Sequence, residues 1–334
     1  MKKISLLLFA VTFMLISNLP AATQDAINLY NKAHKETDDT KKVSLLLKAL
    51  KNTKRKDILA KIHNSLGLAY RRLINHEKSA YHFTKAINYN PKDYNYRANR
   101  CYLYTLMEKY DSALKDCEKT LKLGGKRSRD YNALGLVYQK LGKQESAETF
   151  FKTAIIKSPE NCFYHYNLGD SYYLMKDYDK SVGSFDVALK LCTRYSKAYA
   201  KRGEAFYKLE EYEEAFTDFK YAVKWEPENI DYYKYKIYSL ISLGECGKAL
   251  KDILKLLRIA KDDPESYLTF ALYWTCKGNT EFNNEKALKN ISLAENLGYR
   301  DFLRLKTDEP YKTFFSFIRE LPEYRKLENI SSKP

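Results

Sequence analysis

The stretch that determines the fold of this chain, residues 128–161, reads SRDYNALGLVYQKLGKQESAETFFKTAIIKSPEN. Its apolar residues and one glycine recur at helical intervals, at Tyr131, Leu134, Gly135 and Tyr138 and again at Ala147, Phe151 and Ala154. Side chains at this spacing share one face of a helix, so each half predicts an amphipathic helix. We expect Gly135 to face Ala147 and Ala154, where the two helices approach closely. Pro159 ends the second helix because it cannot donate the next backbone hydrogen bond.

The same pattern recurs every 34 residues without insertion. Six repeats begin at Ala60, Tyr94, Ser128, Cys162, Ser196 and Ile230, which gives the ranges 60–93, 94–127, 128–161, 162–195, 196–229 and 230–263. This spacing resembles the tetratricopeptide (TPR) repeat, a helix-turn-helix motif whose copies stack on their neighbours. The resemblance implies an all-α solenoid that winds into a right-handed superhelix.

The sequence on either side of the six repeats matches the pattern less closely. Residues 23–59 predict a divergent N-terminal repeat or cap, residues 264–299 a further divergent repeat, and residues 300–334 short capping helices and a tail. Terminal repeats have one neighbour instead of two, so departures from the pattern are expected there. Within the array, Arg100, Arg202 and Lys236 replace the apolar residue at the seventh position of their repeats. Their long side chains can cover apolar surface while the charge reaches water.

Residues 1–22 have the order of a secretory signal peptide, with Lys2 and Lys3, an apolar run from Ile4 to Ile16, and small residues near Ala22. We expect cleavage near Ala22 and export to the periplasm or the medium. An uncleaved membrane anchor is the alternative, although the run is shorter than the roughly 20 apolar residues that span a bilayer. Export places the six cysteines in a compartment that permits disulfides.

The formal net charge of +16 favours acidic proteins or an anionic envelope surface as partners. Between Lys41 and Lys61 there are eight Lys or Arg residues and one acidic residue, Asp57. A solvated outer helix face explains this cluster without any partner. Nucleic-acid binding is suggested by charge alone, and export argues against it, so we expect no nucleic-acid partner.

The sequence contains no recognisable catalytic or metal-binding motif. Its five histidines form no HExxH pair and its cysteines no CxxC. Gly124-Gly125-Lys126 lacks the first glycine of a phosphate-binding loop and lies between two repeats. We therefore expect a non-catalytic scaffold without metal or cofactor that binds a protein or peptide. The alternatives are a basic solenoid that binds an anionic envelope surface or nucleic acid, and a regulatory subunit of an envelope enzyme complex.

Two cysteines of one repeat are candidates for a disulfide. Cys162 and Cys192 occupy its positions 1 and 31, and because its two helices are antiparallel, both positions lie at the same end of the helix pair. Cys246 and Cys276 form a less certain second pair, while Cys101 and Cys117 are expected to be buried core thiols. Six cysteines allow fifteen connectivities, so the pairing stays a hypothesis.

The resemblance to TPR proteins also implies where a partner binds, because the first helix of each repeat lines a concave groove, chiefly through positions 2, 5, 9 and 12. The candidate groove residues between the repeats that begin at 128, 162 and 196 are Arg129, Asn132, Tyr166, Asn167, Asp170, Tyr173, Lys197, Lys201 and Tyr207. The next repeat adds Lys234 and Tyr238 at these positions. Aromatic side chains interleaved with polar ones are typical of binding surfaces.

Some TPR domains hold the C-terminal carboxylate of a partner with a clamp of five Lys, Arg and Asn residues. This chain matches three of the five positions, with Asn167, Lys197 and Lys201, while the other two are Asn132 and Leu136. The resemblance therefore implies a reduced clamp for one carboxylate or acidic side chain, with tyrosines stacked beside it. The alternative interpretation of two lysines one turn apart is a solvated helix face.

Overall fold

The computed structural model describes residues 20–302, 304–316 and 318–331, which form two compact units that meet in sequence between Pro159 and Glu160. The predicted signal peptide or anchor lies largely outside these residues. Helices of the first unit are α2 (Ala21–Lys35), α3 (Asp39–Lys51), α4 (Lys56–Arg72), α5 (His76–Tyr89), α6 (Tyr94–Leu106), α7 (Tyr110–Lys122), α8 (Ser128–Lys140) and α9 (Gln144–Lys157). The described part of the chain is all-α and contains no strand.

The second unit contains α10 (Cys162–Leu174), α11 (Tyr178–Leu191), α12 (Ser196–Lys208), α13 (Tyr212–Trp225), α14 (Ile230–Ser242), α15 (Cys246–Ile259), α16 (Pro264–Cys276) and α17 (Glu281–Asn296). It ends with the short elements α18 (Arg304–Thr307), α19 (Tyr311–Phe314), the 3-10 helix η1 (Ile318–Glu320) and α20 (Pro322–Ser331). Six helices, α6, α8, α10, α12, α14 and α16, begin at a residue where the sequence places the start of a repeat. Helix α4 instead begins four residues before Ala60, with Asp57 in its first turn, where an acidic side chain is favourable.

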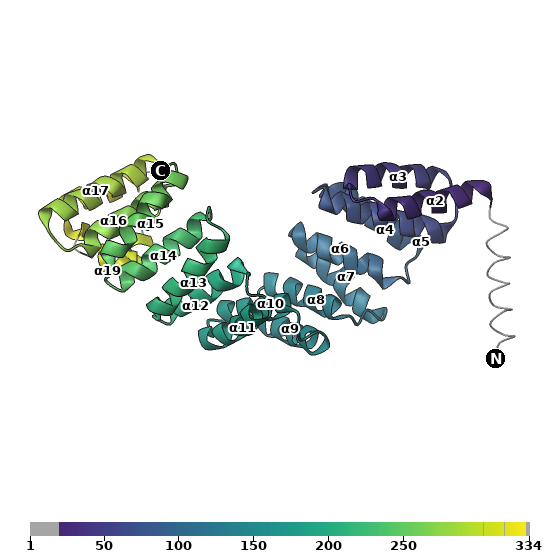
Figure 1. Ribbon diagram of the computed structural model, residues 1–334, viewed down its shortest axis with the longest axis horizontal. Coiled ribbons are helices and arrows are strands. Elements are labelled where there is room, and N and C mark those ends of the chain that lie inside the picture. Colours follow the sequence, from purple (N-terminus) through teal and green to yellow (C-terminus); the bar gives the residue numbers. More distant parts are fainter. Residues whose placement is uncertain (1–19, 303, 317, 332–334) are drawn as a thin grey trace. The chain divides into compact units, whose positions relative to one another are not determined.

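Consecutive helices pack in pairs within each unit (Figure 1), and the chain is an all-α TPR-type solenoid. The first helices of successive pairs also contact one another: α4 with α6 and α6 with α8 in the first unit, and α10, α12, α14 and α16 in turn in the second. In each unit the first helices therefore form a continuous layer. Side chains at equal repeat positions follow one another across that layer.

Four repeats bring their paired helices together by packing a glycine at position 8 against a phenylalanine at position 24. The pairs are Gly67 with Phe83, Gly135 with Phe151, Gly169 with Phe185 and Gly203 with Phe219. A Cβ atom on any of these glycines would lie 2.6–2.9 Å from the nearest ring atom. The nearest neighbour of Gly135 is thus the Phe151 ring, not Ala147 or Ala154 as the sequence suggested, because the large ring fills the space between the helices.

Replacing Gly169 with alanine is expected to destabilise the second unit by about 1–3 kcal/mol, because the fully buried Phe185 ring cannot move away without strain. Gly183 of the same helix pair has space for a Cβ atom, which would meet no other atom within 4 Å, so Gly183→Ala is the matched control. That change is expected to stabilise helix α11 by up to about 1 kcal/mol. Urea unfolding followed by tryptophan fluorescence measures both effects, since the only two tryptophans, Trp225 and Trp274, lie in the second unit. Equal effects of the two substitutions would contradict the packing argument.

The sulfur atoms of all six cysteines are joined in the structure. Cys162 and Cys192 connect the ends of the pair α10 and α11, with Cα atoms 6.0 Å apart, and Cys246 of α15 is bonded to Cys276 of α16. Cys101 and Cys117 are bonded as well, so the expectation of buried thiols was wrong. They occupy positions 8 and 24, where other repeats place glycine and phenylalanine, and at this close helix approach their Cα atoms are 5.4 Å apart.

The basic residues at position 7 have a partner that sequence inspection overlooked. Each pairs with an aspartate sixteen residues later, at position 23: Arg100 with Asp116, Arg202 with Asp218, and Lys236 with Asp252, at 2.6, 2.6 and 2.8 Å. Repeats with leucine at position 7 have no acidic residue at position 23. The arginines also reach the preceding repeat, since Arg100 donates to Thr84 and Arg202 to Asp186. Each charged substitution is therefore part of an ion pair within its own repeat, and the two arginines also connect their repeats to the preceding ones.

A buried pair of histidines lies between α4 and α5. The Nδ1 atoms of His63 and His82 are 2.8 Å apart, and both residues are 7% exposed. One imidazole must donate and the other accept, so this hydrogen bond requires at least one neutral ring. Burial lowers the pKa of His63 to about 4, assisted by Lys85, and burial with the charge of its histidine neighbour lowers the pKa of His82 to about 4.

The first unit is expected to lose stability as the pH falls from about 6.5 to 4. In that window the unfolded histidines bind protons and the folded pair does not, so the stabilisation present above pH 6.5 falls by roughly 3 kcal/mol for each histidine. The control is His63→Tyr with His82→Phe, which copies Tyr131 and Phe150 at the same positions of another repeat. Thermal unfolding by circular dichroism at both pH values should show a smaller acid shift in this variant, and an equal shift would refute the role of the pair.

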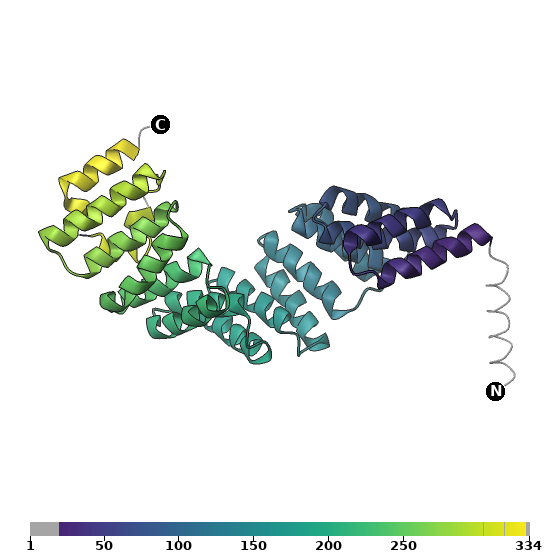
Figure 2. The ribbon, with the colours of Figure 1, turned by 45° about the horizontal axis from the view of Figure 1, so that its top comes forward.

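The C-terminal segment packs against the layer of first helices as well as against the last helix pair. Tyr311 of α19 is 1% exposed, and its hydroxyl lies 2.7 Å from that of Tyr238 on α14. Arg304 forms a 2.8 Å ion pair with Glu265 on α16. Helix α20, yellow in Figure 2, lies beside α17. The segment thus covers the end of the array, and its Arg304 also lines a pocket on the first helices of the second unit.

Candidate functional site

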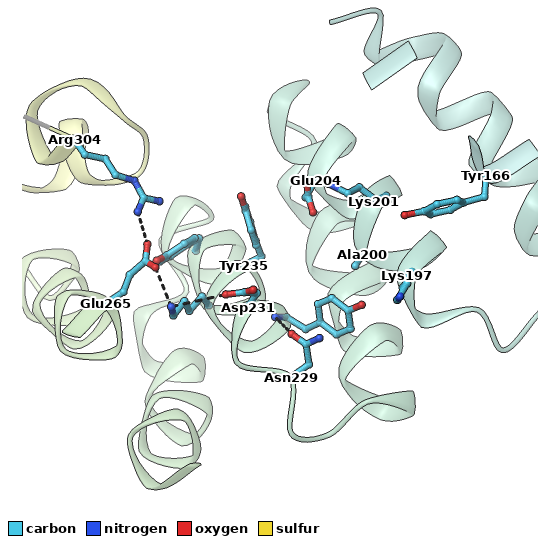
Figure 3. A pocket seen from close by; sticks show the side chains of 13 residues that line it. Tyr166, Lys197, Ala200, Lys201, Glu204, Asn229, Asp231, Tyr235, Glu265 and Arg304 are labelled. Carbon is cyan, nitrogen blue, oxygen red and sulfur yellow. Dashed lines mark hydrogen bonds and ion pairs between the residues drawn. The ribbon is translucent and has the colours of Figure 1, made fainter. Parts of the chain in front are cut away.

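The layer of first helices in the second unit contains a pocket of about 560 Å³. Figure 3 shows its side chains, which come from α10, α12, α14, α16 and the C-terminal segment. The lining residues are Tyr166, Lys197, Ala200, Lys201, Glu204, Asn229, Asp231, Tyr232, Lys234, Tyr235, Tyr238, Glu265 and Arg304. Aromatic rings and both signs of charge therefore meet in one concave surface, as is common in ligand sites.

The structure brings five of the predicted groove residues to this pocket: Tyr166, Lys197, Lys201, Lys234 and Tyr238. Asn167, Asp170 and Tyr173 are on α10 but do not line it; the ring centroid of Tyr173 lies 5.1 Å from the ammonium of Lys201. Arg129 and Asn132 are on α8 in the first unit.

Tyr207 does not contribute to the pocket surface, although it was predicted to stack beside a ligand. It is 7% exposed, and its hydroxyl lies 3.0 Å from the Ser242 hydroxyl. Position 12 of this repeat faces the next helix pair, because the side chain is long enough to reach α14. Tyr207 therefore stabilises the packing between repeats.

The two lysines of the predicted clamp differ in their surroundings. The Lys201 ammonium is 2.8 Å from the Glu204 carboxylate, whose pKa is raised by burial and lowered in part by Lys201. Lys197 is exposed and makes no ion pair within 4 Å in the described part of the chain. Lys197 is thus available to bind a ligand carboxylate, whereas at Lys201 a ligand carboxylate would compete with Glu204.

At the other end of the pocket an ion network surrounds Lys234, which is 5% exposed. Its ammonium lies 2.9 Å from Glu265, 3.2 Å from Asp263 and 3.8 Å from Asp231. Glu265 also pairs with Arg304. Because these carboxylates surround the buried ammonium, Lys234 has a structural role. Only its position in the repeat had suggested that it contacts a ligand in the groove.

Sequence inspection missed Asp231, Tyr235, Glu265 and Arg304. The first three could have been found, because Asp231 and Glu265 occupy position 2 of their repeats, as Lys197 does, and Tyr235 occupies position 6, as Lys201 does. Arg304 comes from outside the repeats and had no such signal. Burial raises the pKa of Tyr235 to about 12, so its phenol stays protonated at neutral pH and can donate a hydrogen bond into the pocket.

A smaller pocket of about 250 Å³ lies between α2, α3 and α4 of the first unit. Lys42 and Arg72 line it, and both pair with Asp39, so their charges are largely compensated. Among the described residues there is no group of three or more His, Cys, Asp or Glu side chains suited to a metal ion. Within the same residues, no helix is both long and apolar enough to cross a bilayer.

Comparison with known proteins agrees with this architecture. A family model described as "Tetratricopeptide repeat" matches residues 131–155 and 196–229. Hsp70-Hsp90 organizing protein 3 of Arabidopsis thaliana is 24% identical over 205 residues, which are 60% of this chain and 35% of that protein. The Hsp70-Hsp90 organizing protein of Triticum aestivum is 24% identical over 242 residues, 64% of this chain and 36% of that protein. The chain thus spans about a third of the length of these relatives.

Two solved structures show the same fold. A tetratricopeptide repeat protein from Parabacteroides merdae has a TM-score of 0.55 at 16% identity, covering 82% of this chain and 99% of that one. PilF of Pseudomonas aeruginosa has a TM-score of 0.56 at 20% identity, covering 64% of this chain and 97% of that one. Together with the 34-residue register and the paired helices, these matches show that the chain is built from tetratricopeptide-type repeats.

Proposed function

We propose that this chain is an exported, non-catalytic adaptor that binds a protein or peptide partner along the first helices of its second unit. The observation that carries the proposal is the pocket of about 560 Å³, which combines exposed Lys197 and Asp231 with a wall of tyrosines. Such a surface offers rigid rings for packing and charges for orientation.

The relatives support binding of proteins in general. The Arabidopsis and wheat proteins are named as organizers of Hsp70 and Hsp90. The order of residues 1–22 and the three disulfides support export, because disulfides persist in oxidising compartments. An exported chain would not meet cytosolic chaperones, so its partner belongs to the envelope or the medium.

The test begins with a pull-down from the envelope and secreted fractions, using the mature protein as bait. Lys197→Ala with Lys201→Ala should then weaken binding of the recovered partner by at least about 1 kcal/mol, and the loss should shrink with added salt. Lys190→Ala on the outer helix α11 is the control, since Lys190 is exposed and does not line the pocket. Unchanged affinity of the double variant would remove the two lysines from the site.

A second candidate function rests on the distribution of charge. Residues 20–159 contain 28 Lys or Arg and 14 Asp or Glu, whereas residues 160–334 contain 28 of each. The whole excess of positive charge in residues 20–334 therefore belongs to the first unit. Within it, Lys51, Lys85 and Lys119 are spaced 34 residues apart and lie on α3, α5 and α7. This pattern favours docking on an anionic envelope surface. Sedimentation with phosphatidylglycerol vesicles, compared with phosphatidylcholine vesicles, tests it.

A further inference from the structure

Position 2 of the repeats forms a row of distinct chemical groups across the second unit. Phe163, Lys197, Asp231 and Glu265 are spaced 34 residues apart and lie in the first turns of α10, α12, α14 and α16. Because each of these helices contacts the next, the four side chains follow one another along the layer. Lys197, Asp231 and Glu265 also line the pocket, as Figure 3 shows. The row reads aromatic, cationic, anionic, anionic.

Three members of this row are available to a ligand and the fourth is not. Phe163 is 56% exposed, with its ring edge against Tyr195. Lys197 is exposed without an ion pair in the described chain, and the Asp231 side chain is 77% exposed, with only a 3.8 Å approach to Lys234. Glu265, by contrast, is held by Lys234 and Arg304. The available groups are therefore one aromatic ring, one cation and one anion, in that order.

The spacing of the row matches an extended polypeptide. Packed helices lie about 8–10 Å apart, and an extended peptide in the polyproline II conformation advances about 3.1 Å per residue with three residues per turn. A peptide that crosses the layer in this conformation therefore presents a side chain in the same direction about once per helix. A ligand with a single negative charge would satisfy Lys197 but leave Asp231 exposed beside it. A segment with both signs of charge satisfies both residues.

We propose that the groove selects an extended peptide segment with an apolar residue over Phe163, an acidic side chain at Lys197 and a basic side chain at Asp231, each about three residues from the next. This inference rests on the proposed function and specifies its ligand. The tyrosines Tyr166, Tyr232 and Tyr235 flank the path and supply ring surface and phenol groups for the peptide backbone. Recognition depends on the order of the charges, since reversing them places like charges together.

The experiment is selection of a displayed library of random peptides, about nine residues long, on the immobilised full-length protein. The expected result is enrichment of sequences in which an acidic and a basic residue lie about three positions apart. Selection on the charge-swapped protein, Lys197→Glu with Asp231→Lys, should return the opposite order of charges. A peptide enriched on the native protein should bind the swapped protein about fivefold more weakly or worse, and its charge-reversed version should recover the loss.

The control protein is Lys190→Glu with Asp179→Lys, a charge swap of the same kind on the outer helix α11, which should select the native pattern. If peptides are enriched but bind the native and swapped proteins equally, this inference is wrong while groove binding stands. If no peptide is enriched on any of the proteins, the proposed peptide-binding function fails and the inference fails with it. Enrichment of acidic peptides without a basic residue would also overturn the charge order.

Discussion

Replacing Asp218 with alanine is expected to destabilise the second unit by about 3–5 kcal/mol. The Asp218 side chain is 3% exposed and accepts two hydrogen bonds from Arg202, at 2.7 and 2.6 Å. Burial acts to lower the pKa of Arg202, but the bonds and charges of Asp218 and Asp186 outweigh it and raise that pKa. Without Asp218 a mostly buried guanidinium keeps only Asp186, whose side chain is 42% exposed. Urea unfolding monitored by tryptophan fluorescence measures the loss.

The chain contains its own control for this prediction. The preceding repeat has Leu168 and Ser184 at the positions of Arg202 and Asp218, and it folds in the same way. The double variant Arg202→Leu with Asp218→Ser should therefore recover most of the stability lost in Asp218→Ala, because it removes the buried charge together with its partner. A double variant as unstable as the single one would show that the ion pair is not the cause.

Removing the disulfide between Cys162 and Cys192 is expected to cost roughly 3–4 kcal/mol, because the bond closes a loop over a sequence separation of 30 residues and so restricts the unfolded chain. The double variant Cys162→Ser with Cys192→Ser should show this loss in urea unfolding of the second unit. Reducing the native protein should lower the stability of the second unit further, because reduction also breaks the bond between Cys246 and Cys276.

Thiol counting provides the independent check on the disulfides. The denatured, non-reduced protein should present no reactive thiol, and the reduced protein should present six, since every cysteine is bonded in the structure. Six reactive thiols before reduction would refute all three bonds. Two reactive thiols that map to Cys101 and Cys117 would restore the expectation of buried thiols in that repeat.

The sequence alone was sufficient to predict the repeat architecture, since the pattern that indicates it lies within each short helix pair. Gly135, Phe151 and Pro159 lie within one helix pair, and the same spacing returns from repeat to repeat, so helix positions follow from short-range periodicity. The pair Cys162 and Cys192 could be proposed because both ends lie in one such motif. The bond between Cys101 and Cys117 could not be proposed in this way, since it depends on how closely the two helices approach. In four other repeats a glycine indicates that close approach, but this repeat has Cys101 in place of the glycine.

Which groove residues are available was decided by the tertiary structure. Sequence register placed Lys197 and Lys201 on one helix face, but only the fold shows that Glu204 engages Lys201 while Lys197 remains without an ion pair in the described chain. The hydroxyl of Tyr238 is hydrogen-bonded to that of Tyr311, 73 residues away, and Arg304, which follows the last repeat, forms an ion pair with Glu265. Periodicity reports the face on which a side chain lies. Its availability depends on charges and rings that distant segments bring to it, and these meet only when the chain has folded.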